Sequence, residues 1–132
     1  MAHADRALRY QSYASDLFSQ TYTRDHPEKV QEWINEIVAA PEPPGDQEIT
    51  LQRIDMIADH DVFGRLGEIT QPSIVICGDC DVAVGQALSE EMAAALPDAE
   101  LVVLHDTGHL VELEQGEEFF RLVSEFITTH LV

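Results

Sequence analysis

Two short apolar runs constrain the fold of this chain more than any other feature. Residues 73–77 (SIVIC) and 100–104 (ELVVL) are continuous, largely β-branched stretches. Such runs are typical of strands buried on both faces, as in a parallel sheet. Between them, residues 86–96 have apolar side chains at helical spacing and stop at Pro97. We therefore expect a strand, a helix and a second strand, joined by a right-handed crossover.

Helical periodicity flanks this unit on both sides. Apolar residues at 3.6-residue spacing predict helices over residues 4–22, 26–39, 47–60 and 116–130. In the last of these we expect the inner face to consist of Phe119, Leu122, Val123, Phe126 and Ile127.

Residues 41–46 (PEPPGD) cannot continue a helix, because three prolines lack amide donors and the glycine is permissive. We place a boundary there, with a helical segment at 1–46 and a core portion at 47–132. A chain of 132 residues has the length of one ordinary domain.

The chain is strongly acidic, with 25 Asp and Glu against 7 Lys and Arg and a formal net charge of −18. This charge repels phosphate backbones and anionic head groups, so we expect neither nucleic acid nor a membrane as a partner. We attribute the acidity to a solvated, aggregation-resistant surface, with a cationic ligand, a basic partner or a high-salt habitat as alternatives. No long apolar run or leader pattern is present, and two cysteines fit a reducing compartment, so we expect a cytoplasmic protein.

Acids and histidines follow both expected strands. Asp79 and Asp81 come after the first strand, and His105 and His109 come after the second. In open parallel sheets, ligands bind at the carboxyl ends of the strands. A carboxylate beside a histidine at that place is the arrangement with which an imidazole accepts a hydroxyl proton and then carries positive charge.

Residues 60–132 resemble the C-terminal portion of the α/β-hydrolase family. The resemblance is carried by Arg65-Leu66-Gly67-Glu68-Ile69, Pro72 to Gly78, Asp81, Ala99 to Leu104, Gly108-His109, Glu114 and Glu118-Phe119. It implies a partial α/β-hydrolase-like fold of two parallel strands with helices, in which residues 1–46 look like the lid helices of the family.

The resemblance also implies roles for individual residues. The family orders its triad as nucleophile, acid and histidine, which assigns the acid to Asp81 and the histidine to His109. Asp79 is the rival for the acid position. Val82, Gly85 and Gly116 stand where the family often has proline, which is a mild departure.

The serious departure is that the 132 residues contain no G-x-S-x-G motif and no glycine-rich oxyanion loop. We therefore expect a truncated hydrolase-like protein that supplies the acid and histidine of a Ser-His-Asp type site for an ester or similar acyl bond. It would be inactive without a nucleophile-bearing half. A two-stranded sheet has two unpaired edges and exposed apolar faces, so we expect a partner chain that completes it, either a second copy or an N-terminal half-hydrolase chain. We also expect a small-molecule substrate and no cofactor.

Other interpretations use the same residues. A non-catalytic binding or assembly module could keep this half of the fold, and co-purification of a nucleophile-bearing chain would separate the two hypotheses. Cys77 and Cys80 form a C-x-x-C pair of the kind found in thiol redox proteins, although Asp79 and Asp81 disfavour a thiolate there. Cys80 as a nucleophile and a zinc site that includes His105 or His109 are weaker alternatives.

Overall fold

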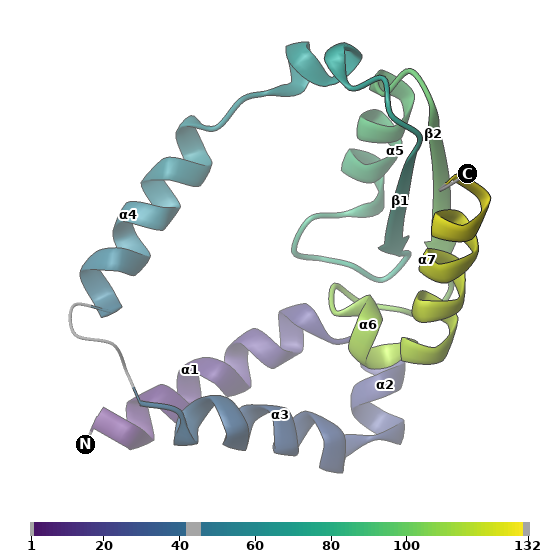
Figure 1. Ribbon diagram of the computed structural model, residues 1–132. Coiled ribbons are helices and arrows are strands. Elements are labelled where there is room, and N and C mark those ends of the chain that lie inside the picture. The colour runs from purple at the N-terminus through teal and green to yellow at the C-terminus, as the bar shows by residue number, and fades with distance from the viewer. Residues whose placement is uncertain (1, 42–45, 131–132) are drawn as a thin grey trace.

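A two-stranded parallel sheet lies at the C-terminal side of the molecule (Figure 1). The computed structural model describes residues 2–41 and 46–130. Strand β1 (Ser73–Gly78) pairs in parallel with β2 (Ala99–Leu104), and helix α5 (Gln86–Ala95) connects them. Val75 and Cys77 on β1 are buried. The predicted unit of strand, helix and parallel strand is confirmed.

Helices α5 and α7 (Gly116–His130) pack on opposite sides of this sheet (Figure 1). The expected inner face of α7 is only partly covered. Phe119, Leu122, Val123 and Phe126 are half-buried, and Ile127 is exposed. The prediction is wrong for Ile127, because two strands offer too little sheet surface to bury a whole helix face.

Three helices form a separate layer at the other end of the molecule (Figure 1). They are α1 (Ala2–Leu17), α2 (Gln20–Asp25) and α3 (Pro27–Ala39). The prediction of one helix over 4–22 is wrong, because the chain breaks after Leu17 and restarts at Gln20. Ser19 begins the new helix as its N-cap, and its side chain accepts a hydrogen bond from the amide of Tyr22 at 3.1 Å.

The core of this helical layer is small and rich in aromatic rings. Its fully buried members are Ala14, Phe18, Val30 and Ile34. The Trp33 ring meets Phe18 edge to face, with 5.4 Å between centroids. Arg6, 8% exposed, donates to the carbonyl of Ala40 at 2.6 Å and so links α1 to the end of α3. Helices α1, α2 and α3 therefore pack largely on one another.

Helix α4 (Asp46–Asp59) and the short helix η1 (Phe63–Glu68) run between the two layers. The proline-rich boundary predicted at 41–46 falls largely on residues 42–45, which lie outside the described residues. Residues 48–65 are all exposed. Among them are large apolar side chains, namely Ile49, Leu51, Ile54, Met56, Ile57, Val62 and Phe63. Within residues 2–41 and 46–130, no helix is long and apolar enough to cross a membrane.

Candidate active site

The two loops that carry the acids and histidines leave the sheet at the same end. Gly78 at the end of β1 is in register with Leu104 at the end of β2. The two loops then pack tightly: the amide of Asp79 donates to the carbonyl of Leu104 at 3.0 Å, and that of Cys80 donates to the carbonyl of Thr107 at 2.9 Å. A side chain at Gly78 would collide with the backbone of Thr107, which explains the glycine at this position.

Asp81 and His109 are brought together across these loops. Asp81 Oδ2 lies 2.9 Å from His109 Nδ1, and the side chains are 7% and 35% exposed. The second carboxylate oxygen of Asp81 accepts hydrogen bonds from the amides of Ala83 at 2.8 Å and Val84 at 3.0 Å. The acid is therefore fixed by its own loop before it meets the histidine.

The surroundings of Asp81 keep it ionised. Burial raises its pKa, but the amides of Val84 and Ala83 and the imidazole of His109 outweigh that effect and lower the pKa below its usual range. An ionised carboxylate only accepts hydrogen bonds, so His109 Nδ1 must carry the proton in their contact. In the neutral ring, Nε2 then has a free lone pair and can act as a base.

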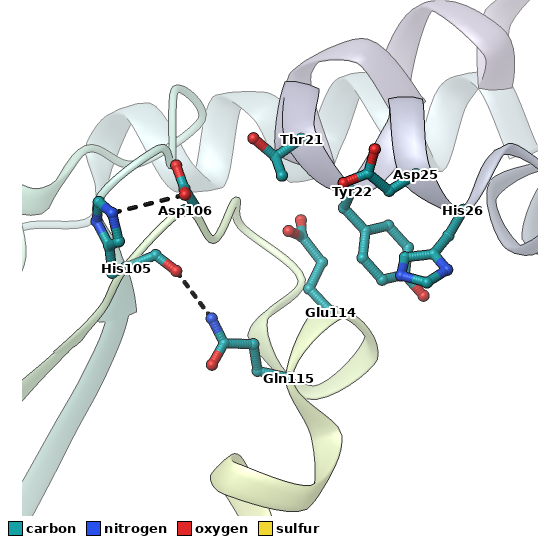
Figure 2. A pocket seen from close by; sticks show the side chains of 8 residues that line it. All are labelled: Thr21, Tyr22, Asp25, His26, His105, Asp106, Glu114 and Gln115. Atoms are coloured by element: carbon teal, nitrogen blue, oxygen red, sulfur yellow. Dashed lines mark hydrogen bonds and ion pairs between the residues drawn. The ribbon is translucent and has the colours of Figure 1, made fainter.

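A second pair of the same kind lies beside the first. Asp79, the rival acid, is 2.6 Å from His105 Nδ1, so the structure gives each aspartate its own histidine. His105 Nε2 is 3.5 Å from Asp106, and the His105 side chain is 86% exposed. The hydrogen bond to Asp79, with the charge of Asp106, raises the pKa of His105. Figure 2 shows His105 and Asp106 on the rim of a cavity of about 190 Å³, across from α2.

The cysteines do not form an activated pair. Cys77 is buried in β1, Cys80 is exposed on the loop, and both are free thiols. A hydrogen bond with Asp79, together with burial and the Asp79 charge, raises the pKa of Cys80. Because the thiolate is the reactive form, this environment argues against the redox and nucleophile interpretations of Cys80. Across residues 2–41 and 46–130 no group of three or more His, Cys, Asp or Glu is placed to hold a metal ion.

Sequence reasoning missed two features of this site. It considered Asp79 and His105 but did not predict that they pair with each other. It included Glu114 in the family resemblance without assigning it a role, whereas the structure places its carboxylate against Ser19 and Gly108. Helical spacing could not have revealed the pairing of Asp79 with His105 or of Ser19 with Glu114, because each joins segments that are distant in the sequence.

Comparisons with known proteins place the chain in a wider context. No protein-family model matches it. It is 36% identical over 64 residues to 2-hydroxy-6-oxononadienedioate/2-hydroxy-6-oxononatrienedioate hydrolase 1 of Dechloromonas aromatica, a match that covers 48% of this chain and 22% of that protein. The match thus spans about a fifth of the curated relative's length.

Solved structures resemble nearly the whole chain. A thermophilic esterase from Thermogutta terrifontis superimposes with a TM-score of 0.78 and 25% identity, over 98% of this chain and 50% of the esterase. An α/β hydrolase enzyme from a Medee basin deep-sea metagenome library gives a TM-score of 0.71 at 19% identity, over 96% and 50% of the two chains. The chain therefore has a partial α/β-hydrolase fold and corresponds to the C-terminal portion of that family.

Proposed function

We propose that this chain supplies the acid and the histidine of a Ser-His-Asp type hydrolytic site that acts on an ester or similar acyl bond. The observation that carries the proposal is the contact of 2.9 Å between Asp81 Oδ2 and His109 Nδ1, with the other Asp81 oxygen held by two backbone amides. The nucleophile belongs to a part of the fold outside these 132 residues, because no G-x-S-x-G occurs within them.

In the proposed reaction, His109 Nε2 takes the proton of a serine hydroxyl while the serine oxygen attacks the acyl carbonyl. His109 then gives that proton to the departing alcohol, which leaves an acyl-enzyme. A water molecule loses a proton to the same nitrogen and attacks the acyl group, and His109 returns that proton to the serine oxygen as the acyl–serine bond breaks and the acid is released. Asp81 holds the ring in the required tautomer and stabilises the imidazolium in each step.

A cavity beside the pair supports a small-molecule substrate. It has a volume of about 510 Å³ and is lined by Tyr13, Asp16, Leu17, Val82 and Ala83. Val82 and Ala83 directly follow Asp81, and the carbonyl of Leu17 accepts the amide proton of His109 at 2.8 Å. Leu17, Val82 and Ala83 give this space an apolar side that fits an acyl or alcohol portion of a substrate, and Asp16 places an acidic group in its lining.

The nucleophile-bearing half would also provide the missing cover. The structure describes two strands in the sheet, so each has an unpaired edge, and the apolar side chains of α4 are exposed. The esterase alignment includes nearly all of this chain and half of the esterase. In the esterase, its remaining half therefore accompanies a region equivalent to this chain, and we propose the same kind of neighbour here.

The experiment compares hydrolysis of p-nitrophenyl acetate by the chain alone and by the chain mixed with an N-terminal half-hydrolase. The esterase half that this chain does not match is the first such half to use, provided that it carries G-x-S-x-G. We expect turnover only in the mixture, and its loss in His109→Ala. Turnover by the chain alone that disappears in His109→Ala would overturn the proposal and indicate a nucleophile within these residues, with Cys80→Ser as the next variant.

The exposed apolar residues of α4 also favour a second candidate function, a non-catalytic assembly module that forms a homo-oligomer. Light scattering of the purified chain distinguishes the two. A stable homo-oligomer that binds no half-hydrolase and gives no turnover in the mixture supports the assembly module. A species that gains mass and activity on mixing supports the hydrolytic site.

A further inference from the structure

Glu114 is a half-buried acid that accepts three hydrogen bonds from two separate segments. It is the last residue of α6 (Val111–Glu114). Its Oε1 accepts hydrogen bonds from the amide of Ser19 at 2.8 Å and from the amide of Gly108 at 3.1 Å. Its Oε2 accepts from the Ser19 hydroxyl at 2.6 Å. In Figure 2 the carboxylate points away from its own helix and toward α2.

The Ser19 end of these contacts is a buried junction between α1 and α2. Ser19 is 2% exposed. Its hydroxyl donates to Glu114 and at the same time accepts the amide proton of Tyr22 at the start of α2. A hydroxyl can do both, because it has one proton to donate and two lone pairs. Glu114 thereby satisfies an amide and a hydroxyl that would otherwise be buried without an acceptor.

The other end of the contacts is the residue before His109. Gly108 donates its amide proton to Glu114, and the amides of His109 and Leu110 both donate to the carbonyl of Leu17, at 2.8 and 3.2 Å. There is no space for a side chain at Gly108, since a Cβ there would lie 2.6 Å from the amide nitrogen of Ser19. The backbone on both sides of His109 is thus fixed against the same short segment, residues 17–19.

From these contacts we propose that Glu114 is a positioning residue, which holds the His109 backbone against the α1–α2 junction so that Nδ1 faces Asp81. It touches no reacting atom and is not a catalytic residue. Its importance for catalysis rests on the proposed function, whereas its effect on the His109–Asp81 contact does not. This role depends on the length of the Glu114 side chain and on its acceptor atoms, because one carboxylate oxygen accepts hydrogen bonds from two amides on different segments.

The test uses the full chain with labelled histidine and follows the His109 Nδ1 proton by NMR. A hydrogen bond to Asp81 protects this proton and gives a distinct downfield signal. Glu114→Asp keeps the charge but is one methylene shorter, so it cannot reach Ser19 and Gly108 together. We expect the signal to broaden or vanish in this variant. Glu114→Gln keeps an oxygen for both amides and should retain the signal, as should the control Glu112→Ala on the exposed side of α6.

Ser19→Gly provides a second, milder perturbation if Glu114→Asp does not fold. It removes the hydrogen bond from the hydroxyl to Oε2 and the one that the hydroxyl accepts from Tyr22, but glycine costs little as an N-cap, and we expect a weaker Nδ1 signal. A folded Glu114→Asp with a signal like that of the unmodified chain overturns the proposal. So does loss of the signal in Glu114→Gln, because that side chain still offers the required acceptor.

Activity in the mixture with a nucleophile-bearing half gives an independent measurement. We expect Glu114→Asp to lower kcat by about tenfold to a hundredfold with little change in KM, as for a displaced catalytic group. Glu114→Gln should restore most of the kcat. If no mixture is active but the NMR signal responds as described, the positioning role stands and the proposed function fails. If mixtures are active and Glu114→Asp matches the unmodified chain in kcat and signal, only the positioning role fails.

Discussion

The two aspartate–histidine pairs at the end of the sheet have nearly the same chemistry in different surroundings. Asp79 and His105 are 2.6 Å apart, and Asp81 and His109 are 2.9 Å apart. The shorter contact is the exposed one, since the His105 side chain is 86% exposed and that of His109 is 35% exposed. The length of the hydrogen bond therefore does not distinguish the candidate catalytic pair.

What distinguishes the pairs is how each partner is held. Asp81 is fixed by the amides of Ala83 and Val84, and the backbone of His109 is fixed by Leu17. The backbone carbonyl of His105 is also held, by Thr107 Oγ1 and Gln115 Nε2, but its ring projects into solvent between two carboxylates, Asp79 and Asp106. A general base is effective only when its lone pair is held in a fixed direction toward the proton it accepts. The contacts that hold the side chains therefore decide which pair can act in catalysis, more than the hydrogen bond within the pair.

The largest expected effect separates the pairs by activity. In the mixture with a nucleophile-bearing half, Asp81→Asn should lower kcat by about 10⁴-fold, because an amide stabilises neither the required tautomer nor the imidazolium. Asp79→Asn is the matched variant on the exposed pair, and its kcat should stay close to that of the unmodified chain. Initial rates of p-nitrophenyl acetate hydrolysis at saturating substrate measure both.

The opposite ranking, with Asp79→Asn inactive and Asp81→Asn active, would assign the acid to Asp79. In that case His105 would become the candidate base, and the burial of the His109 pair would have no catalytic meaning.

A smaller effect concerns the packing around His109. Gly108→Ala places a methyl group 2.6 Å from the Ser19 nitrogen and 2.7 Å from the Leu17 oxygen, and neither backbone atom can move freely. We expect the free energy of unfolding to fall by about 1–3 kcal/mol or more. Gly116→Ala is the control, since its Cβ meets nothing within 4 Å.

Urea denaturation followed by circular dichroism compares these two glycine variants. Gly116→Ala should leave the midpoint unchanged or raise it slightly, because alanine restricts the unfolded chain. Equal midpoints for the two variants would mean that the His109 loop is not held as tightly as its contacts indicate.

Much of the secondary structure could be predicted from the sequence. The strands at 73–78 and 99–104 are short, β-branched runs, a pattern that predicts strands, although only Leu104 of β2 is buried. Helix α3 was predicted at 26–39 and is observed at Pro27–Ala39, because Pro27 and the apolar spacing both mark it. The positions of Asp81 and His109 after these strands followed from the family resemblance, and their catalytic role stays a prediction.

The features that could not be predicted depend on contacts between distant segments. The break between α1 and α2 forms where Ser19 meets Glu114, which is 95 residues away. Apolar spacing continues across the break, so the local pattern favours one helix. The exposure of α4 could not be predicted for the same reason. Its apolar residues have helical spacing, but little in the described structure packs on them.

The smallest expected effect concerns the protonation of the exposed pair. Asp79→Asn removes the main cause of the raised pKa of His105, so the NMR titration midpoint of its ring should fall toward the ordinary value of about 6.5. Asp81→Asn is the control and should leave that midpoint unchanged.

Because the folded pKa is raised, the contribution of His105 to stability is fully present below its unfolded pKa and is lost as pH rises through the folded pKa. The stability difference between the Asp79→Asn variant and the unmodified chain should therefore shrink as pH rises through the folded pKa of His105. It should be small throughout, since solvent screens an exposed pair. A His105 midpoint that does not respond to Asp79→Asn would mean that the two side chains do not pair in solution, and the contrast with His109 would then be sharper still.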